Sequence, residues 1–146
     1  MRHLTILVPD GENNLSSIVG AYKIFSRANE YWKKAGKGEL FKIELAGISN
    51  KVEFYGGLFS VNPNTHISAI KKTDLIIIPA IDGDMQTALE QNKDFIPWIV
   101  KQYKDGAQVA SLCIGAFLLA STGLITGRNA LHIGLQRMLS EKCFLM

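Results

Sequence analysis

Cys113 is the residue of this sequence best suited to chemistry, because of the residues on either side of it. It stands between Leu112 and Ile114, with Ser111 two positions before it and Gly115 two positions after it. A residue at a sharp strand-to-helix turn adopts a strained backbone and needs small neighbours at those two positions. Ser111 and Gly115 meet that need, so we predict a strained turn at Cys113.

Such a turn would favour two kinds of chemistry. The backbone N–H groups of Cys113 and Ile114 would point at one place, and the thiol would lie at a helix N-terminus, which lowers the pKa of a thiol. A reactive thiolate or an anion-binding pocket would follow. An ordinary buried cysteine is the alternative, but the apolar segments on both sides of Cys113 favour the turn.

The elements that must position this turn are read from hydrophobic patterns. Short continuous apolar runs indicate buried strands at residues 4–8 and 75–79. Residues 41–48, which alternate and then run apolar, and residues 108–112 are also expected to be strands. Two short segments, 51–54 and 58–61, flank Tyr55-Gly56-Gly57 and indicate a hairpin. Helices are expected at 16–34, with Ser16 and Ser17 as caps, and at 65–71, 84–91, 94–104 and 115–121.

This alternation predicts an α/β fold, a mostly parallel sheet with helices on both faces. In such sheets ligands bind at the carboxyl ends of the strands. Residues 9–14, residues 80–84 and Cys113 would meet at that edge. We therefore expect any binding site to lie there.

Composition narrows the class of protein further. A chain of 146 residues with 47% hydrophobic residues has room for one domain, which we place at residues 1–146. The net charge of +3 comes from scattered basic residues and does not predict nucleic-acid binding by this segment.

Cysteine spacing and the N-terminal segment indicate the compartment. Cys113 and Cys143 form no closely spaced pair. The apolar run before Pro9 is too short for a signal peptide or a membrane span. We expect a cytoplasmic protein without membrane contact, metal or cofactor.

Residues 106–128 (GAQVASLCIGAFLLASTGLITGR) closely resemble ThiJ/PfpI-like domains of the class I glutamine amidotransferase-like superfamily. Residues 9–11, 19–25 and 74–79 also match, and the closest branch is the N-terminal domain of AraC-type transcription regulators. The resemblance implies a three-layer flavodoxin-like fold and a homodimer. It also implies DNA binding only through a C-terminal domain with two helix-turn-helix motifs, which is absent from this chain.

The sequence departs from the enzymes of this superfamily in the first loop. Those enzymes pair the cysteine with a carboxylate three residues before the glycine that Gly20 matches, and that position here is Ser17. A serine cannot act as a carboxylate base or share a proton with the thiol. Glu12 in the same loop either partly substitutes for the acid or is a solvated loop residue.

Two further departures concern the loops near the cysteine. The family often has Pro-Gly-Gly after the buried strand, where this chain has Pro79-Ala80-Ile81, and these side chains allow a ligand less close an approach to the backbone. Relatives also place a histidine after the segment that ends at Arg128. His132 is either that histidine or a surface residue.

The chain stops where the family would begin a further strand and helix. We therefore expect a C-terminally truncated domain, either a fragment or a prematurely ended product. The missing unit would leave an open sheet edge and expose the apolar faces of the helices at 94–104 and 115–122. Association would then be needed to cover those faces.

We weigh three functions. The first is the effector-sensing and dimerisation domain of an AraC-type regulator, with a small-molecule effector held by Glu12, Ser17, Ala80, Ile81, Cys113 and Ile114. The second is a cysteine-dependent hydrolase, hydratase or glyoxalase-like enzyme, in which Cys113 and His132 would be catalytic. The third is a thiol-based oxidation sensor, which needs only a reactive and accessible cysteine.

Overall fold

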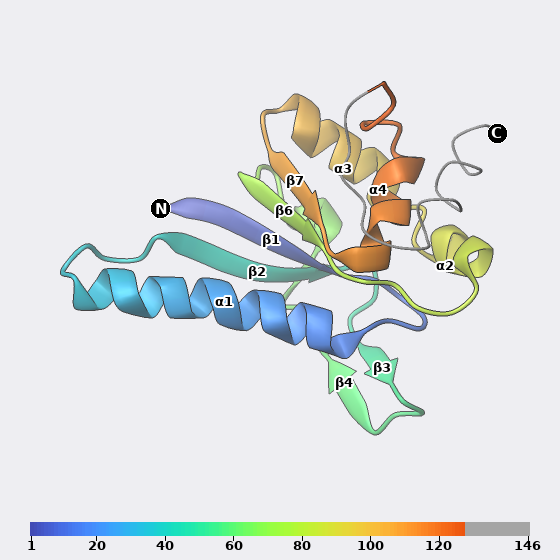
Figure 1. Ribbon diagram of the computed structural model, residues 1–146, viewed down its shortest axis with the longest axis horizontal. Helices are drawn as coiled ribbons and strands as arrows, with labels where there is room; N and C mark the ends of the chain where they lie inside the picture. Colours follow the sequence, from blue (N-terminus) through green and yellow to red (C-terminus); the bar gives the residue numbers. More distant parts are fainter. Residues whose placement is uncertain (128–146) are drawn as a thin grey trace.

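A five-stranded parallel sheet forms the centre of the molecule (Figure 1). The structure is a computed structural model, and it describes residues 1–127. The strands are β1 (Arg2–Val8), β2 (Phe41–Gly47), β5 (Thr65–His66), β6 (Leu75–Ile78) and β7 (Gln108–Ser111), in the spatial order β5-β2-β1-β6-β7. From β1 the chain adds β2 and then β5 on one side of the sheet. It then returns to add β6 and β7 on the other side of β1, so the direction in which strands are added reverses between β1 and β6.

Helices cover both faces of the sheet. Leu4, Ile6 and Val8 of β1 pack with Ile18 and Ala21 of α1 (Leu15–Lys34) on one face. On the other face, Leu7 and residues of β6 pack with α2 (Met85–Gln91), α3 (Phe95–Lys104) and α4 (Ala116–Ser121). Alternate residues of one strand thus serve two cores, which confirms the predicted three-layer α/β fold with a mostly parallel sheet.

The predicted hairpin is present as a separate two-stranded sheet. β3 (Val52–Phe54) and β4 (Phe59–Val61) pair antiparallel, with Phe54 opposite Phe59. Tyr55 has a φ of 54° at the start of the turn, a left-handed conformation that the following Gly56 and Gly57 also adopt. Val52 and Phe54 anchor the hairpin in the cluster that contains α1.

Two local expectations are wrong. Residues 65–71 form no α-helix: Thr65 and His66 extend the sheet beside Ala46 and Gly47, and a short 3-10 turn, η1 (Ile67–Ala69), follows. The backbone of Thr65 and His66 thus pairs with β2 at the edge of the sheet and does not form the first turn of a helix. The cap of α1 is neither Ser16 nor Ser17 but Asn14, whose side chain accepts a hydrogen bond from the Ser17 N–H.

The expected exposure of the later helices is also wrong. Phe95 and Ile99 of α3 and Leu118 of α4 are fully buried, because the two helices pack against one another and against the sheet in one cluster. Apart from Met1, the exposed large apolar side chains of residues 1–127 lie on α1 and the hairpin instead. None of the helices within residues 1–127 is both long and apolar enough to cross a membrane.

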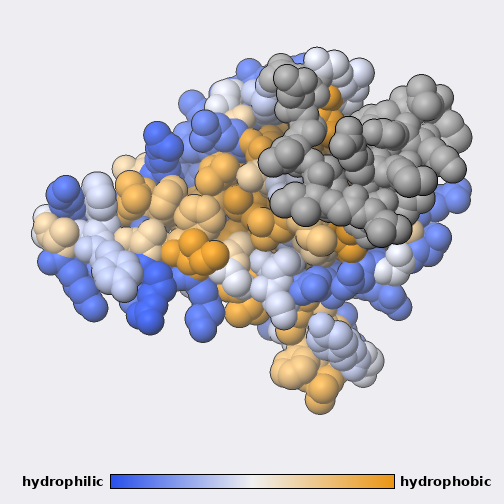
Figure 2. Space-filling view, viewed as in Figure 1, coloured by the Kyte–Doolittle hydropathy of each residue, from blue (hydrophilic) through white to orange (hydrophobic). Residues whose placement is uncertain are grey.

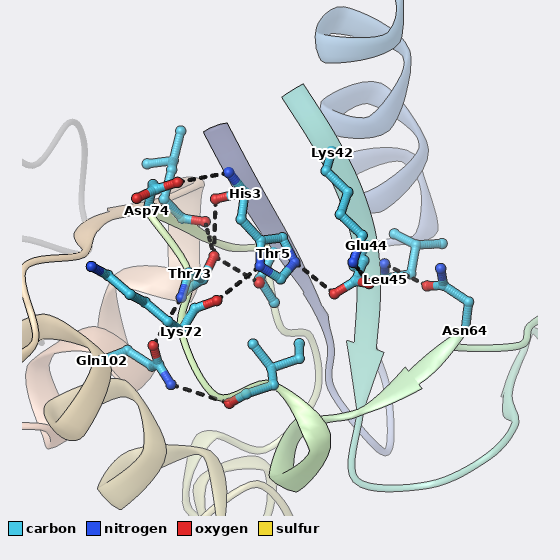
Figure 3. A network of polar contacts seen from close by, with 12 residues as sticks. His3, Thr5, Lys42, Glu44, Leu45, Asn64, Lys72, Thr73, Asp74 and Gln102 are labelled. Carbon is cyan, nitrogen blue, oxygen red and sulfur yellow. Dashed lines mark hydrogen bonds and ion pairs between the residues drawn. The ribbon is translucent and has the colours of Figure 1, made fainter. Parts of the chain in front are cut away.

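A polar network ties the amino-terminal end of the sheet to α3 (Figure 3). The Thr73 N–H donates to Oε1 of Gln102 at 3.0 Å, and Nε2 of Gln102 donates to the Ile70 and Lys71 carbonyls at 3.3 Å. Gln102 is 1% exposed, so water cannot replace these partners. The Thr5 hydroxyl, also buried, extends the network by donating to the Thr73 hydroxyl at 2.9 Å.

An ion pair lies at the side of the same network. Glu44 contacts Nε2 of His3 at 2.6 Å and Nζ of Lys42 at 2.7 Å. Desolvation by burial raises the pKa of Glu44, but the hydrogen bonds from Lys42 and His3 outweigh it and hold the pKa below its ordinary value. The carboxylate therefore stays ionised between β1 and β2.

We predict that Gln102→Ala lowers the free energy of unfolding by about 2–4 kcal/mol, because it leaves the Thr73 N–H buried without a partner and opens a cavity. Urea denaturation measures the change. Gln86→Ala, at an exposed position of α2, is the matched control and should stay within about 0.5 kcal/mol. Equal effects of the two substitutions would contradict the role given to Gln102.

Candidate functional site

The backbone at Cys113 is strained, as its sequence context predicts. β7 ends at Ser111, Leu112 is extended, and Cys113 takes a φ of +49° at the start of a 3-10 turn, η2 (Cys113–Gly115), which leads into α4. A positive φ is unfavourable for a residue with a side chain and persists only where the surroundings hold it. Here the Leu112 N–H donates to the Ile78 carbonyl at 2.8 Å and fixes the turn to β6.

Gly115 explains why a small residue is needed after the cysteine. A Cβ atom at this position would lie 2.3 Å from the Pro79 carbonyl oxygen and 2.9 Å from that of Ile78. The turn therefore packs directly on the backbone that follows β6. Cys113 itself is exposed, with a free thiol, while Ile114 is half-buried.

Ser17 joins the first loop to the residue after Pro79. Its hydroxyl donates to the Asn14 carbonyl at 2.7 Å and accepts from the Ala80 N–H at 3.1 Å. A carboxylate could accept from Ala80 but has no proton to donate to Asn14. Ser17 therefore fits this position because its hydroxyl both donates and accepts a hydrogen bond. The Ala80 N–H already has its hydrogen-bond acceptor in Ser17.

The two loops after β1 and β6 are joined along their length. The Asn14 N–H donates to the Ala80 carbonyl at 3.2 Å, and the Asp82 N–H donates to the Glu12 carbonyl at 2.9 Å. Asn13 and Ile81 form a bridge between these two bonds. The predicted meeting of these loops at the carboxyl ends of the strands is thus confirmed.

The predicted ligand-binding residues do not share one surface. Ile81 is completely buried and Ala80 is 4% exposed, so the Ile81 side chain belongs to the core on the α3 face. Glu12 is exposed, and its carboxylate lies against Gly83. His132 and Cys143 lie outside the described residues.

A cleft of about 800 Å³ opens beside the joined loops. Its walls are the first loop (10–13), the hairpin (51–56) and the segment from the second loop into α2 (82–84, Thr87, Ala88 and Gln91). It lies where the strand order reverses, the place where open parallel sheets bind ligands. Cys113 is not among the lining residues. The sequence predicted the hairpin, but no pattern in it showed that the hairpin would form a wall of this cleft.

Negative charge dominates the cleft. Among residues 1–127, the lining includes one ammonium group, that of Lys51, which pairs with Glu53 at 2.6 Å. The hydrogen bonds from the backbone N–H and the hydroxyl of Thr87 hold the pKa of Asp84 below its ordinary value, so this carboxylate stays charged. The acidic residues of the lining are Asp10, Glu12, Glu53, Asp82 and Asp84.

Asn13 is a largely buried polar residue of the cleft lining. It is 5% exposed, and its side-chain nitrogen donates to the Pro9 and Gly11 carbonyls. Within residues 1–127 its side-chain oxygen has no hydrogen-bond partner. A buried acceptor without a partner is unfavourable, so the site suits a ligand that brings a donor.

Comparison with known proteins identifies the family. The model of the DJ-1/PfpI family matches residues 7–141, which is most of the sequence. The chain belongs to the DJ-1/PfpI family. No curated protein matches the sequence.

Solved structures of similar fold include proteins with and without a regulatory description. A protein from Vibrio parahaemolyticus, described as a transcriptional regulator, has a TM-score of 0.82 and 21% identity, over 99% of this chain and 73% of its own. An AraC family transcriptional regulator from Pseudomonas putida has a TM-score of 0.75 and 14% identity, over 97% and 72%. Oxidised DJ-1 from Toxoplasma gondii has a TM-score of 0.63 and 19% identity, over 90% and 67%. At these identities the likeness to this DJ-1/PfpI domain is one of fold.

We predict that Ser17→Ala lowers the free energy of unfolding by about 1–3 kcal/mol, because the Ala80 N–H loses its acceptor. Ser16→Ala, one position earlier and exposed, is the matched control and should change stability by less than about 0.5 kcal/mol. Chemical denaturation of both variants checks the difference. A Ser17→Ala protein as stable as the wild type would show that the bond contributes nothing to the joined loops.

Proposed function

We propose that this chain is the effector-sensing and dimerisation domain of an AraC-type transcription regulator, and that it binds a small metabolite rather than transforming one. The observation that carries this proposal is the hydrogen bond between Ser17 and the Ala80 N–H. Ser17 occupies the position where the resemblance to superfamily enzymes implies a catalytic acid. Its hydroxyl instead joins two loops, because it donates a hydrogen bond to the Asn14 carbonyl and accepts one from the Ala80 N–H.

The surroundings of the thiol support binding over catalysis. Among residues 1–127, no hydrogen bond links the Cys113 thiol to an acid or a base. The carboxylate of Glu12, the other acid of the first loop, lies against Gly83 in the cleft. A general acid or base contributes about 10²–10⁴ in rate, and Ser17 cannot act as a carboxylate base.

The cleft supplies the binding site in this proposal. Its volume of about 800 Å³ is in the range of small-molecule sites. Its carboxylates and the unpartnered Asn13 oxygen favour a compact ligand with a positive charge and N–H or O–H donors. We therefore place the effector beside Glu12, Asn13 and Asp82 rather than at Cys113.

The structural neighbours agree with a regulatory role. The Vibrio and Pseudomonas proteins are described as transcriptional regulators, and this chain covers 73% and 72% of their lengths. In the proposed regulator, DNA is contacted by a separate C-terminal domain with helix-turn-helix motifs. Sequencing the DNA that follows the codon for Met146 tests this part, because the proposal requires such motifs in the same reading frame.

A cysteine-dependent enzyme is the second candidate, and the exposed thiol at a strained turn is the observation that favours it. We predict that iodoacetamide modifies Cys113, but that the protein does not turn over methylglyoxal above the rate of Cys113→Ala. Mass spectrometry and a product assay measure the two outcomes. Turnover that is lost in Cys113→Ala would support the enzyme and direct attention to Glu12.

Ligand binding is tested with cationic probes. We predict that putrescine, arginine or choline raises the unfolding temperature by several degrees at saturation, since a bound ligand stabilises the folded state, and that citrate does not. Asp82→Asn should weaken this effect at least tenfold in ligand concentration. Glu39→Gln removes an equal charge at an exposed position away from the cleft lining and should leave the effect unchanged. Equal weakening by both variants would show nonspecific attraction rather than a site.

A further inference from the structure

Basic residues that lie far apart in the sequence meet at one edge of the sheet. Parallel strands all begin at the same edge, and the helices that connect them end there. In Figure 1, the N-terminus and the turns that lead into β2 and β7 lie on the side away from the hairpin and α2. We name this side the strand-start edge. Six of its basic residues are Arg2, Lys33, Lys34, Lys71, Lys72 and Lys104.

Backbone hydrogen bonds hold the starts of four strands side by side. The Arg2 N–H donates to the Leu40 carbonyl at 2.8 Å, which joins β1 to the turn before β2. The Asp74 N–H donates to the His3 carbonyl at 2.9 Å and joins β6 to β1. The Gln108 N–H donates to the Asp74 carbonyl at 2.9 Å and adds β7. Neighbouring strands lie about 4.8 Å apart, so the four strand starts span about 15 Å.

The ends of α1 and α3 lie at this edge as well. The Gln102 side chain donates to the Ile70 and Lys71 carbonyls, which joins the last turn of α3 to the segment before β6. Lys104 is the last residue of this helix. The last two residues of α1 are also lysines, and the turn that follows them leads directly into β2. Helix ends and strand starts thus bring their basic residues to one side of the molecule.

The six basic side chains that define the edge are accessible to a partner. All six are exposed, and within residues 1–127 none of them forms an ion pair. Figure 3 shows the ammonium group of Lys72 pointing away from the network that its carbonyl joins. In Figure 2, hydrophilic residues follow the outline of the molecule from the end of α1 past the N-terminus toward α3. The edge therefore presents positive charge to solvent.

The remaining charges of the strand-start edge leave this excess in place. Three further lysines are engaged: Lys37 lies over the ring of Trp32 at 4.6 Å, and Lys42 and Lys101 each pair with an acid. With these three, the edge has nine basic residues among residues 1–127. Its four acidic residues are Glu39, Glu44, Asp74 and Asp105. The difference between nine and four is an excess of five positive charges.

The opposite edge of the sheet carries the opposite charge. There, five carboxylates and one ammonium group line the cleft among residues 1–127. The seven residues of β1 separate the two edges by about 20 Å. Charge is thus divided along the strands, whereas along the chain the basic residues are scattered. The sequence alone therefore did not show the basic edge.

Helix dipoles explain only part of this distribution. Lysines at the ends of α1 and α3 stabilise those helices by compensating the negative end of each helix dipole. Arg2 begins a strand, however, and Lys71 and Lys72 lie in a loop. The capping of helices gives no reason for these three charges to gather. A negatively charged partner does.

We propose that the strand-start edge contacts the phosphate backbone of duplex DNA without reading the base sequence. This goes beyond the proposed function, in which a separate domain binds DNA, and it rests on that function only for the choice of partner. Lysine binds phosphate as a point charge, whereas it is depleted from protein–protein interfaces. A duplex carries one negative charge per about 1.7 Å of its axis, so an edge of about 15 Å faces several phosphates. The acidic cleft would face away from the DNA and stay open to its ligand.

Fluorescence anisotropy of a labelled duplex titrated with the full chain tests the proposal. We expect a dissociation constant below about 100 µM at about 50 mM salt, and an affinity at least about tenfold lower at about 200 mM, because lysine–phosphate contacts release counterions. Lys71→Gln with Lys72→Gln should raise the dissociation constant at least about fivefold, with unchanged far-ultraviolet circular dichroism. Lys23→Gln with Lys93→Gln removes the same charge at exposed positions away from the edge and should leave the constant within about twofold.

Three results would overturn the proposal. They are no binding at 100 µM, equal weakening by the two pairs of substitutions, and competition by polyglutamate that equals competition by unlabelled DNA of the same charge. The last result would assign the edge to an acidic protein segment. If the variant at Lys71 and Lys72 is unfolded, Arg2→Gln with Lys104→Gln decides by the same fivefold criterion.

Failure of this inference and failure of the proposed function are distinguishable. If no helix-turn-helix motif follows Met146 in the reading frame, the proposed regulator is overturned, while measured binding of DNA through Lys71 and Lys72 would still stand. If such motifs follow and the strand-start edge binds no DNA, this inference alone is lost.

Discussion

The arrangement of this protein depends on the hydrogen bonds between the two loops that follow β1 and β6. The chain leaves these adjacent strands toward opposite faces of the sheet, so the polar backbone groups of both loops must find partners at the edge between them. They find them in one another, through the bonds of Asn14 and Ser17 to Ala80 and of Asp82 to Glu12. The same bonds place the start of α1, the loops that line the cleft and the segment against which the cysteine turn packs.

The cysteine turn is held by this edge but is not part of the cleft. Gly115 lies against the Pro79 carbonyl, which is one residue before the Ala80 amide that Ser17 engages. The strain at Cys113 is thus maintained by backbone packing rather than by a partner for its thiol. In this DJ-1/PfpI domain the backbone at Cys113 is strained, while Ser17 joins two loops through the hydrogen bonds of its hydroxyl.

The cleft adjoins both α1 and the hairpin. The first loop lines the cleft and runs directly into α1, and the hairpin contributes Tyr55 both to the cleft wall and to an exposed aromatic pair with Phe59. In the proposed regulator, a ligand beside Glu12 would therefore lie next to both the loop that leads into α1 and the hairpin.

The sequence by itself determined the layers and the strained turn, because both follow from local patterns. Buried parallel strands require continuous apolar runs, and Ser111 and Gly115 are the small residues that a sharp turn at Cys113 needs. The tertiary structure alone decided the position of the cleft, the task of Ser17 and the burial of Ile81. These depend on which loops meet across the sheet and on where the hairpin packs, and contacts between residues so far apart in the chain leave no periodic signal in the sequence. For the same reason the sequence did not show that Thr65 and His66, at the start of the segment predicted as a helix at 65–71, pair with β2 at the sheet edge.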